Sequence, residues 1–149
     1  MVEWNSLREG SPLVYELFEH TADLGLRVAA NSFEELLAEA AHGLAAMVIL
    51  HPERLETRAT WVIEVRGTDP DYLLFDWLHE LLIEFERSGR LPAEVNIELT
   101  MEGLRAVCHG EPFEDARHFA SHEVKAITYH GLSVVEEQGH WRAEVIVDI

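Results

Sequence analysis

The chain has 149 residues, of which 48% are hydrophobic and 26% charged, a size and composition typical of one globular domain with a buried core. Its formal net charge at pH 7 is −17, and an acidic surface repels phosphate backbones, so direct nucleic-acid binding is not expected. No apolar run approaches the roughly 18 residues that a membrane-spanning helix needs, so no membrane partner is expected either.

Two features favour a cytoplasmic location. The N-terminal residues lack the basic and apolar regions of a secretory signal. The single cysteine, Cys108, excludes an internal disulfide, which fits a reducing compartment. Cys108 itself is predicted to be a small buried side chain on a strand.

The N-terminal part is organised around a polar segment at residues 19–25. Apolar and β-branched residues predict strands on both sides of this segment, at 14–18 and 24–29. Polar connections between strands often carry chemistry, because the strands hold them in place. The segment, with His20 and Asp23, is therefore the first candidate site, although many such connections are polar only because they face water.

A first amphipathic helix is predicted at residues 32–48. Ser32 and Glu35 form a capping box at its start. Apolar residues then recur at helical spacing, and Pro52 marks the end. A β-branched and aromatic run at residues 60–66 predicts the next strand.

A second amphipathic helix is predicted at residues 70–87. Asp69 suits the N-cap, Pro70 the first helical position and Gly89 the C-cap. One face carries an apolar stripe that is expected to pack on a sheet. The other face is expected to be solvated and carries Asp76, His79, Glu80, Glu84 and Glu86.

Beyond Pro92 the hydrophobic period falls to two, which predicts a series of strands. They are expected at residues 95–99, 104–110, 122–130, 132–136 and 141–148, with a polar loop at 111–121. Short turns favour antiparallel pairing. The predicted fold class is α+β, mainly antiparallel β-sheet with both helices packed on it. Residues 1–13 are expected to be a loose lead-in to a single domain at 14–149.

The candidates for chemistry are carboxylates, histidines and Lys125. The sequence contains no Gly-rich phosphate loop, no zinc-type cysteine pair and no His-Glu-x-x-His helix. Lys125 is the only lysine among eleven lysine and arginine residues, and alternation places it in the middle of the strand predicted at 122–130. Chance in an arginine-rich composition is the alternative explanation.

Asp23 and Asp148 are oxygen donors at predicted strand ends, and together they would bind a hard divalent cation if their strands are neighbours. The α-carboxylate of Ile149 would add another oxygen ligand if the natural chain ends there. His20 would add a nitrogen ligand, which favours manganese or zinc. The sequence alone leaves open whether these residues meet.

Several segments resemble, in the same order, signatures of the archease family. The longest are HTADLGL at residues 20–26, EVKAITYH at 123–130 and VIVDI at 145–149. Shorter matches are LLFDWL at 73–78, Gly110-Glu111 and Arg117-His118. The resemblance extends from about residue 14 to the end of the sequence, and several collinear matches are much more specific than any single one.

This resemblance implies an accessory protein, not an enzyme, that serves the RtcB-type RNA ligase in tRNA splicing and RNA repair. The ligase joins a 2′,3′-cyclic phosphate or 3′-phosphate end to a 5′-hydroxyl end with GTP and divalent metal. Archeases promote guanylylation of the ligase and its multiple turnover, so contact with GTP and RNA is expected only through the ligase. The family resemblance also implies an α+β fold with two helices.

The resemblance assigns metal-associated roles to Asp23 and Asp148 and a functional requirement to Lys125. Its extension to His20 is less direct, and it leaves calcium, manganese and magnesium open as the metal. Two rival functions remain: a stand-alone metal-dependent hydrolase that uses the same residues, and a chaperone-like module whose acidic surface binds basic clients.

Overall fold

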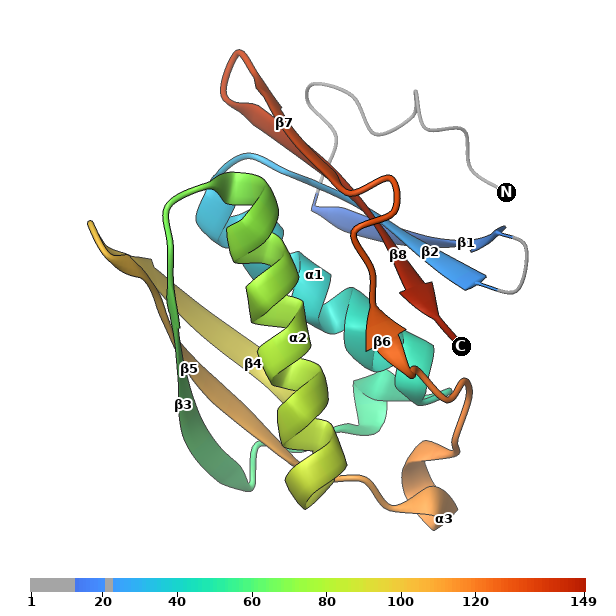
Figure 1. Cartoon of the computed structure of the whole chain (residues 1–149). Coiled ribbons are helices and arrows are strands. Elements are labelled where there is room, and N and C mark those ends of the chain that lie inside the picture. The colour runs from blue at the N-terminus through green and yellow to red at the C-terminus, as the bar shows by residue number, and fades with distance from the viewer. Residues whose placement is uncertain (1–12, 21–22) are drawn as a thin grey trace.

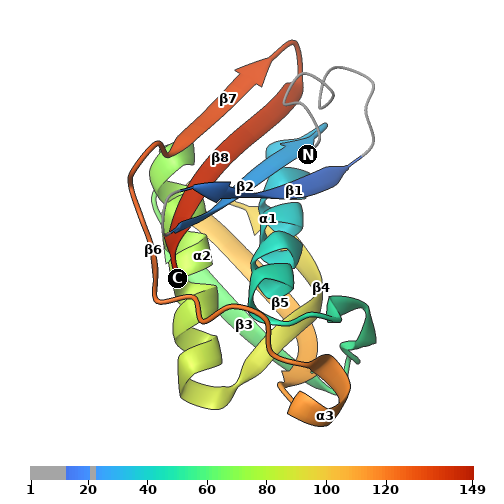
Figure 2. The same ribbon diagram turned by 90° about the vertical axis from the view of Figure 1, so that its right-hand side faces the viewer.

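In the computed structural model, which describes residues 13–20 and 23–149, two α-helices lie between two antiparallel β-sheets (Figures 1 and 2). Each helix contacts strands of both sheets. The side chains of Glu19 and His20 lie outside the description, as does the lead-in expected at residues 1–13 apart from its last residue. The predicted α+β class and its two amphipathic helices are confirmed.

The first sheet joins the N-terminal and C-terminal strands. Its order is β1 (Val14–His20), β2 (Asp23–Ala30) and β8 (His140–Asp148). The far edge of β8 is shared by β7 (Ser133–Glu137) and β6 (Ala126–Ile127). Because β2 and β8 pair along their whole length, residues from the two ends of the domain lie side by side.

The second sheet has the order β3 (Ala59–Arg66), β5 (Gly103–Pro112) and β4 (Arg90–Leu99). The strand predicted at 95–99 therefore starts earlier than expected. Its register shifts between Pro92 and Glu94, and such an irregularity allows a proline inside a strand.

Helix α1 (Phe33–Val48) starts as predicted. The Ser32 hydroxyl accepts a hydrogen bond from the backbone N–H of Glu35 at 3.1 Å, which satisfies one donor of the open first turn. A single 3₁₀ turn, η2 (Pro52–Arg54), follows the helix.

Helix α2 (Pro70–Ser88) also has the predicted caps. The Asp69 carboxylate accepts from the backbone N–H groups of Asp71 and Tyr72. Gly89 ends the helix with φ 78°, a left-handed conformation that glycine adopts without a side-chain clash. Both ends of the helix are thus set by local chemistry.

The core fills the space between the three layers. Trp77 of α2 is fully buried, and its indole N–H donates to the carbonyl of Leu37 on α1 at 2.8 Å. Cys108 is buried on β5 as predicted, and burial together with the nearby Glu84 charge raises the pKa of its thiol to about 12. No helix in the described ranges is long and apolar enough to cross a membrane.

The long strand predicted at residues 122–130 is wrong, since only the two residues of β6 pair there. The preceding backbone bonds to α1 instead. The N–H groups of Ser121 and His122 donate to the carbonyls of Val48 and Met47 at 2.9 and 3.0 Å. These carbonyls belong to the last turn of α1 and lack partners within the helix, so they compete successfully with a strand ladder.

Candidate functional site

Asp23 and Asp148 are register partners on the neighbouring antiparallel strands β2 and β8. Such partners have Cα atoms about 4.5–5.5 Å apart and side chains on the same face of the sheet. Asp148 is exposed and Asp23 partly exposed. The structure therefore brings together two carboxylates that are 125 positions apart in the sequence, and we call them the acidic pair.

His20 occupies the neighbouring register position, opposite Asp23 on β1. Its backbone extends the row that contains the acidic pair, whereas its side chain is outside the described set. Its role as a ligand stays a prediction.

Lys125 lies one residue before β6 and not in the middle of a long strand, which corrects its predicted placement. Its backbone N–H donates to the carbonyl oxygen of Asp148 at 2.8 Å, and its side chain is exposed. The only lysine of the chain is thus attached, through its main chain, to one member of the acidic pair.

Buried neighbours hold the acidic pair in place. Leu24 and Val147, the next register partners on β2 and β8, are 5% and 1% exposed. The Ile149 side chain also packs against the core. This end of the sheet is therefore anchored on both sides of Asp148, as a strand end needs to be if it is to position ligands.

The neighbouring positions on the outer face of this sheet carry an ion-paired arginine. Arg27 of β2 lies 3.2 Å from the Glu144 carboxylate and 3.8 Å from the Glu16 carboxylate. Its guanidinium also lies 4.1 Å from the centre of the Phe18 ring, which covers Gly25. The next acids along these strands, Glu16 and Glu144, are thus already paired with Arg27.

The described side chains around the acidic pair do not form a closed metal cage. Among them, a set without the side chains of Glu19 and His20, no group of three or more His, Cys, Asp or Glu residues could hold a metal ion. Two carboxylates are nevertheless what Mg²⁺ commonly takes from a protein, with phosphate oxygens and water completing its octahedron. The pair therefore fits a cation that is shared with a bound phosphate.

A buried polar cluster lies where η2, β5 and the short helix α3 (Asp115–His118) meet. Glu111 and His118 are 1% and 0% exposed, and their Oε2 and Nε2 atoms are 3.1 Å apart. Arg117 donates to Glu111 Oε1 at 2.6 Å, and the backbone N–H of Glu56 donates to Oε2 at 2.7 Å. Burial raises the pKa of Glu111, but these hydrogen bonds outweigh it and lower the pKa to about 2.

The polar loop predicted at 111–121 is therefore wrong in part, because it includes a helical turn and two buried ionisable residues. His118 accepts a hydrogen bond at Nδ1 from the backbone N–H of Glu114 at 2.9 Å, so Nε2 is the atom that donates to Glu111. With all its polar atoms bonded, the cluster ties three segments together. The only sequence cue was that Gly110-Glu111 and Arg117-His118 match family segments.

Glu84 is a second acid that the sequence analysis placed wrongly. It is 5% exposed and accepts hydrogen bonds from Arg87, Ser88 and Arg90. Burial raises the pKa of Glu84, but these hydrogen bonds outweigh burial, so the pKa lies below its ordinary value. The solvated face predicted for α2 is interrupted at this residue.

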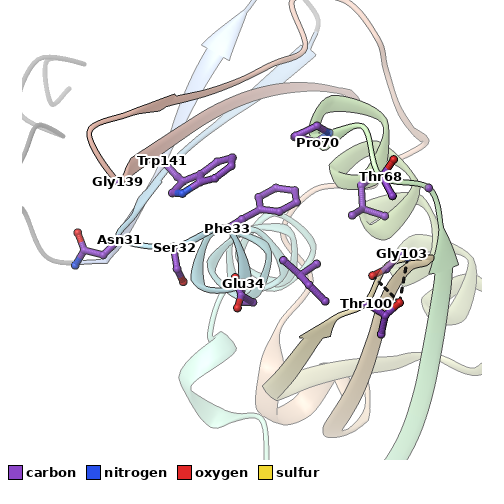
Figure 3. A pocket seen from close by; sticks show the side chains of 13 residues that line it. Asn31, Ser32, Phe33, Glu34, Thr68, Pro70, Thr100, Gly103, Gly139 and Trp141 are labelled. Carbon is purple, nitrogen blue, oxygen red and sulfur yellow. Dashed lines mark hydrogen bonds between the residues drawn. The ribbon is translucent and has the colours of Figure 1, made fainter.

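An open hollow of about 480 Å³ lies at the opposite end of β2 and β8 from the acidic pair (Figure 3). Phe33 and Trp141 stack in its wall with ring centres 4.9 Å apart, and Pro70 and Thr100 line the other side. Seven residues along a strand correspond to about 23 Å. The hollow is therefore separate from the acidic pair.

A family model described as the archease protein family (MTH1598/TM1083) matches residues 15–149. The chain belongs to the archease family. A protein archease from Methanopyrus kandleri is 40% identical over 139 residues, which cover 91% of this chain and 99% of the relative. A protein archease from Pyrococcus abyssi is 36% identical over 140 residues, which cover 91% and 98%.

Solved structures show the same fold. The solution structure of protein 1598 from Methanobacterium thermoautotrophicum superposes with a TM-score of 0.73 at 28% identity, covering 91% of this chain and 98% of that one. The crystal structure of a Thermotoga maritima archease, described as a possible chaperone, gives a TM-score of 0.63 at 24% identity, covering 89% and 94%. The predicted family is thus confirmed by sequence, and the predicted fold class by structure.

Proposed function

We propose that this archease-family chain is an accessory protein of an RtcB-type RNA ligase, and that it promotes GTP-dependent guanylylation and multiple turnover of that ligase in tRNA splicing or RNA repair. The observation that carries the proposal is the register pairing of Asp23 with Asp148, together with the Lys125 main-chain bond to Asp148. The family resemblance implies a role for these same three residues.

The chemistry of guanylylation explains why such a cluster is useful. A nucleotide triphosphate carries several negative charges, and its reaction with a ligase side chain depends on neutralising and positioning them. A divalent cation on the acidic pair supplies that neutralisation when it is bound. Calcium, manganese and magnesium all accept carboxylate oxygens, so the acidic pair is compatible with each of them.

Lys125 adds a compact positive charge beside the acidic pair. An ammonium group contacts a phosphate as a point charge, without the planar geometry that a guanidinium imposes. In this proposal Asp23 and Asp148 orient the cation, and Lys125 contacts a phosphate or a carboxylate of the ligase. The chain acts in the cytoplasm as a partner in trans and catalyses no reaction of its own.

The test is a ligation assay with substoichiometric RtcB-type ligase, GTP and manganese, with and without this protein. We expect multiple turnover only when the protein is present, and we expect its loss with Asp23→Asn or Asp148→Asn. Glu98→Gln, which removes an exposed acid from β4 of the other sheet, is the matched control and should act like the wild type.

Three other results would contradict this proposal. Turnover of a phosphate ester by the isolated protein would favour the hydrolase. Equal loss of activity with Glu98→Gln would favour a general acidic surface that binds clients. Undiminished stimulation by both aspartate variants would remove the acidic pair from the function.

A further inference from the structure

An aromatic strip runs along the outer side of α2 beside β6. We define it as Tyr72, Phe75 and His79 of α2 and Tyr129, which follows β6. The Phe75 and Tyr129 rings stack with centres 3.9 Å apart and planes at 9°. Tyr72 meets Tyr129 edge to face at 5.9 Å, and His79 stacks on Phe75 at 6.0 Å.

The core accounts for only part of the strip, because Phe75 packs against it but the two tyrosines are exposed. The buried face of α2 already carries its own apolar stripe, which includes Leu74, Trp77 and Leu78. Tyr72 and Tyr129, by contrast, are each 58% exposed. Exposed rings that are held by each other lose little side-chain freedom on binding, which is the property of residues that dominate protein interfaces.

The charge around the strip selects the kind of partner. Asp76 and Glu80, which neighbour Phe75 and His79 along α2, are acidic and at least partly exposed. In the described part of the chain, arginines lie over the rings of Phe18, Phe119 and Trp61, and none lies over the strip. Aromatic faces flanked by carboxylates suit an incoming guanidinium, which stacks on the ring and pairs with the acids.

One member of the strip, Tyr129, lies on the segment that also carries Lys125. The N–H and hydroxyl of Thr128 both donate to the carbonyl of Ile146, at 3.1 and 2.8 Å, and fix Tyr129 beside β8. The same segment binds Asp148 through the Lys125 main chain. A partner that contacts the acidic pair would therefore meet the strip along this edge of the sheet.

We propose that the aromatic strip is the docking surface for an arginine-bearing face of the RtcB-type ligase, an inference that rests on the proposed function. The strip supplies affinity, whereas the acidic pair and Lys125 supply the stimulation itself. Single-stranded RNA also stacks on aromatic rings, but a chain of net charge −17 repels its backbone, so a protein partner is favoured.

The test separates affinity from stimulation in the ligation assay. With Y72A/Y129A we expect the protein concentration that gives half-maximal stimulation to rise at least tenfold, while stimulation at saturation stays at the wild-type level. Tyr72→Phe with Tyr129→Phe keeps the rings and should act like the wild type. Tyr15→Ala is the matched control, because it removes an exposed tyrosine from β1, outside the strip.

Salt and charge variants test the partner chemistry. Asp76→Asn with Glu80→Gln should also raise the half-maximal concentration and should weaken its dependence on salt. The substituted side chains are at least partly exposed, so the melting temperature of each variant should lie within about 3 °C of the wild-type value. Such a result excludes misfolding as the cause of a weaker stimulation.

The possible failures are distinguishable. If the wild type stimulates the ligase but Y72A/Y129A keeps the wild-type half-maximal concentration, the docking surface is wrong and the proposed function stands. If the wild type gives no stimulation, the proposed function is wrong, and the ligase is then also wrong as the partner of the strip. Binding of single-stranded RNA by the protein alone, lost in Y72A/Y129A, would overturn the choice of a protein partner.

Discussion

Asp23 and Asp148 face each other across the β2–β8 ladder as direct register partners. Like charges directly opposite on antiparallel strands destabilise a sheet. A cation bound between the two carboxylates, as proposed above, would offset this repulsion. Binding of the proposed cation is therefore expected to stabilise this sheet, and this effect can be measured without the ligase.

The first prediction is that manganese or calcium raises the melting temperature of the wild type. At a metal concentration about 100 times the dissociation constant, binding to the folded state adds about 2.7 kcal/mol. For a chain of this size that corresponds to about 5 °C or more. Differential scanning fluorimetry with and without each metal gives the readout.

Asp23→Asn and Asp148→Asn should each abolish this metal-induced rise. Without metal, Asp148→Asn should be as stable as the wild type or slightly more stable, because one like charge is gone. Glu98→Gln should respond to metal like the wild type. A full metal-induced rise in either aspartate variant would show that the cation binds elsewhere.

The second prediction separates Lys125 from the metal. Because the main chain of Lys125 makes the bond to Asp148 and its side chain is exposed, Lys125→Gln should fold normally and keep the metal-induced rise in melting temperature. It should nevertheless lose stimulation of the ligase, and Lys125→Arg should recover only part of it. Arg66→Gln, an exposed cation on β3, is the control. Normal stimulation by Lys125→Gln would remove the side chain from the function.

The parts of the fold that local chemistry determines were predictable from the sequence. The Ser32 and Asp69 caps and the Gly89 terminus set both helices to within a residue or two. The strand predicted at 122–130 failed at its start because the backbone N–H of His122 bonds to the end of α1, and a hydrophobic pattern carries no information about such a distant acceptor. Alternation describes side chains, whereas this error concerns main-chain partners.

The candidate site was predictable only as a conditional statement. Their places at predicted strand ends and the family resemblance identified Asp23 and Asp148 as possible ligands, but their contact depends on the pairing of β2 with β8, which is not a local property. Glu84 and Glu111 were missed for the opposite reason: charged residues are normally exposed, and only tertiary partners make their burial tolerable.

The third prediction concerns acid stability. The pKa of Glu111 is about 2 in the folded chain and 4.5 as its ordinary value, so the charged form stabilises the fold. This contribution, on the order of 3 kcal/mol, is fully present above pH 4.5 and is lost as the pH falls towards 2. Glu111→Gln should be clearly less stable at pH 7 and should lose less stability on acidification.

Unfolding in denaturant at several pH values between 7 and 2 measures this effect. Glu114→Gln, which removes an exposed partner of the same Arg117, is the control and should change little. Parallel loss of stability with acid in the wild type and Glu111→Gln would show that other groups cause the acid sensitivity.

The fourth prediction concerns Gly25, two residues from Asp23 on β2. A methyl group at Gly25 would overlap the Phe18 ring, which the Arg27 guanidinium contacts at 4.1 Å. Gly25→Ala must therefore push the ring aside, at a cost of about 1–3 kcal/mol. In a Phe18→Ala background the obstacle is absent, so adding Gly25→Ala should cost much less. Chemical denaturation of the two single variants and the double variant gives the coupling energy, and simple additivity of the two changes would refute the proposed contact.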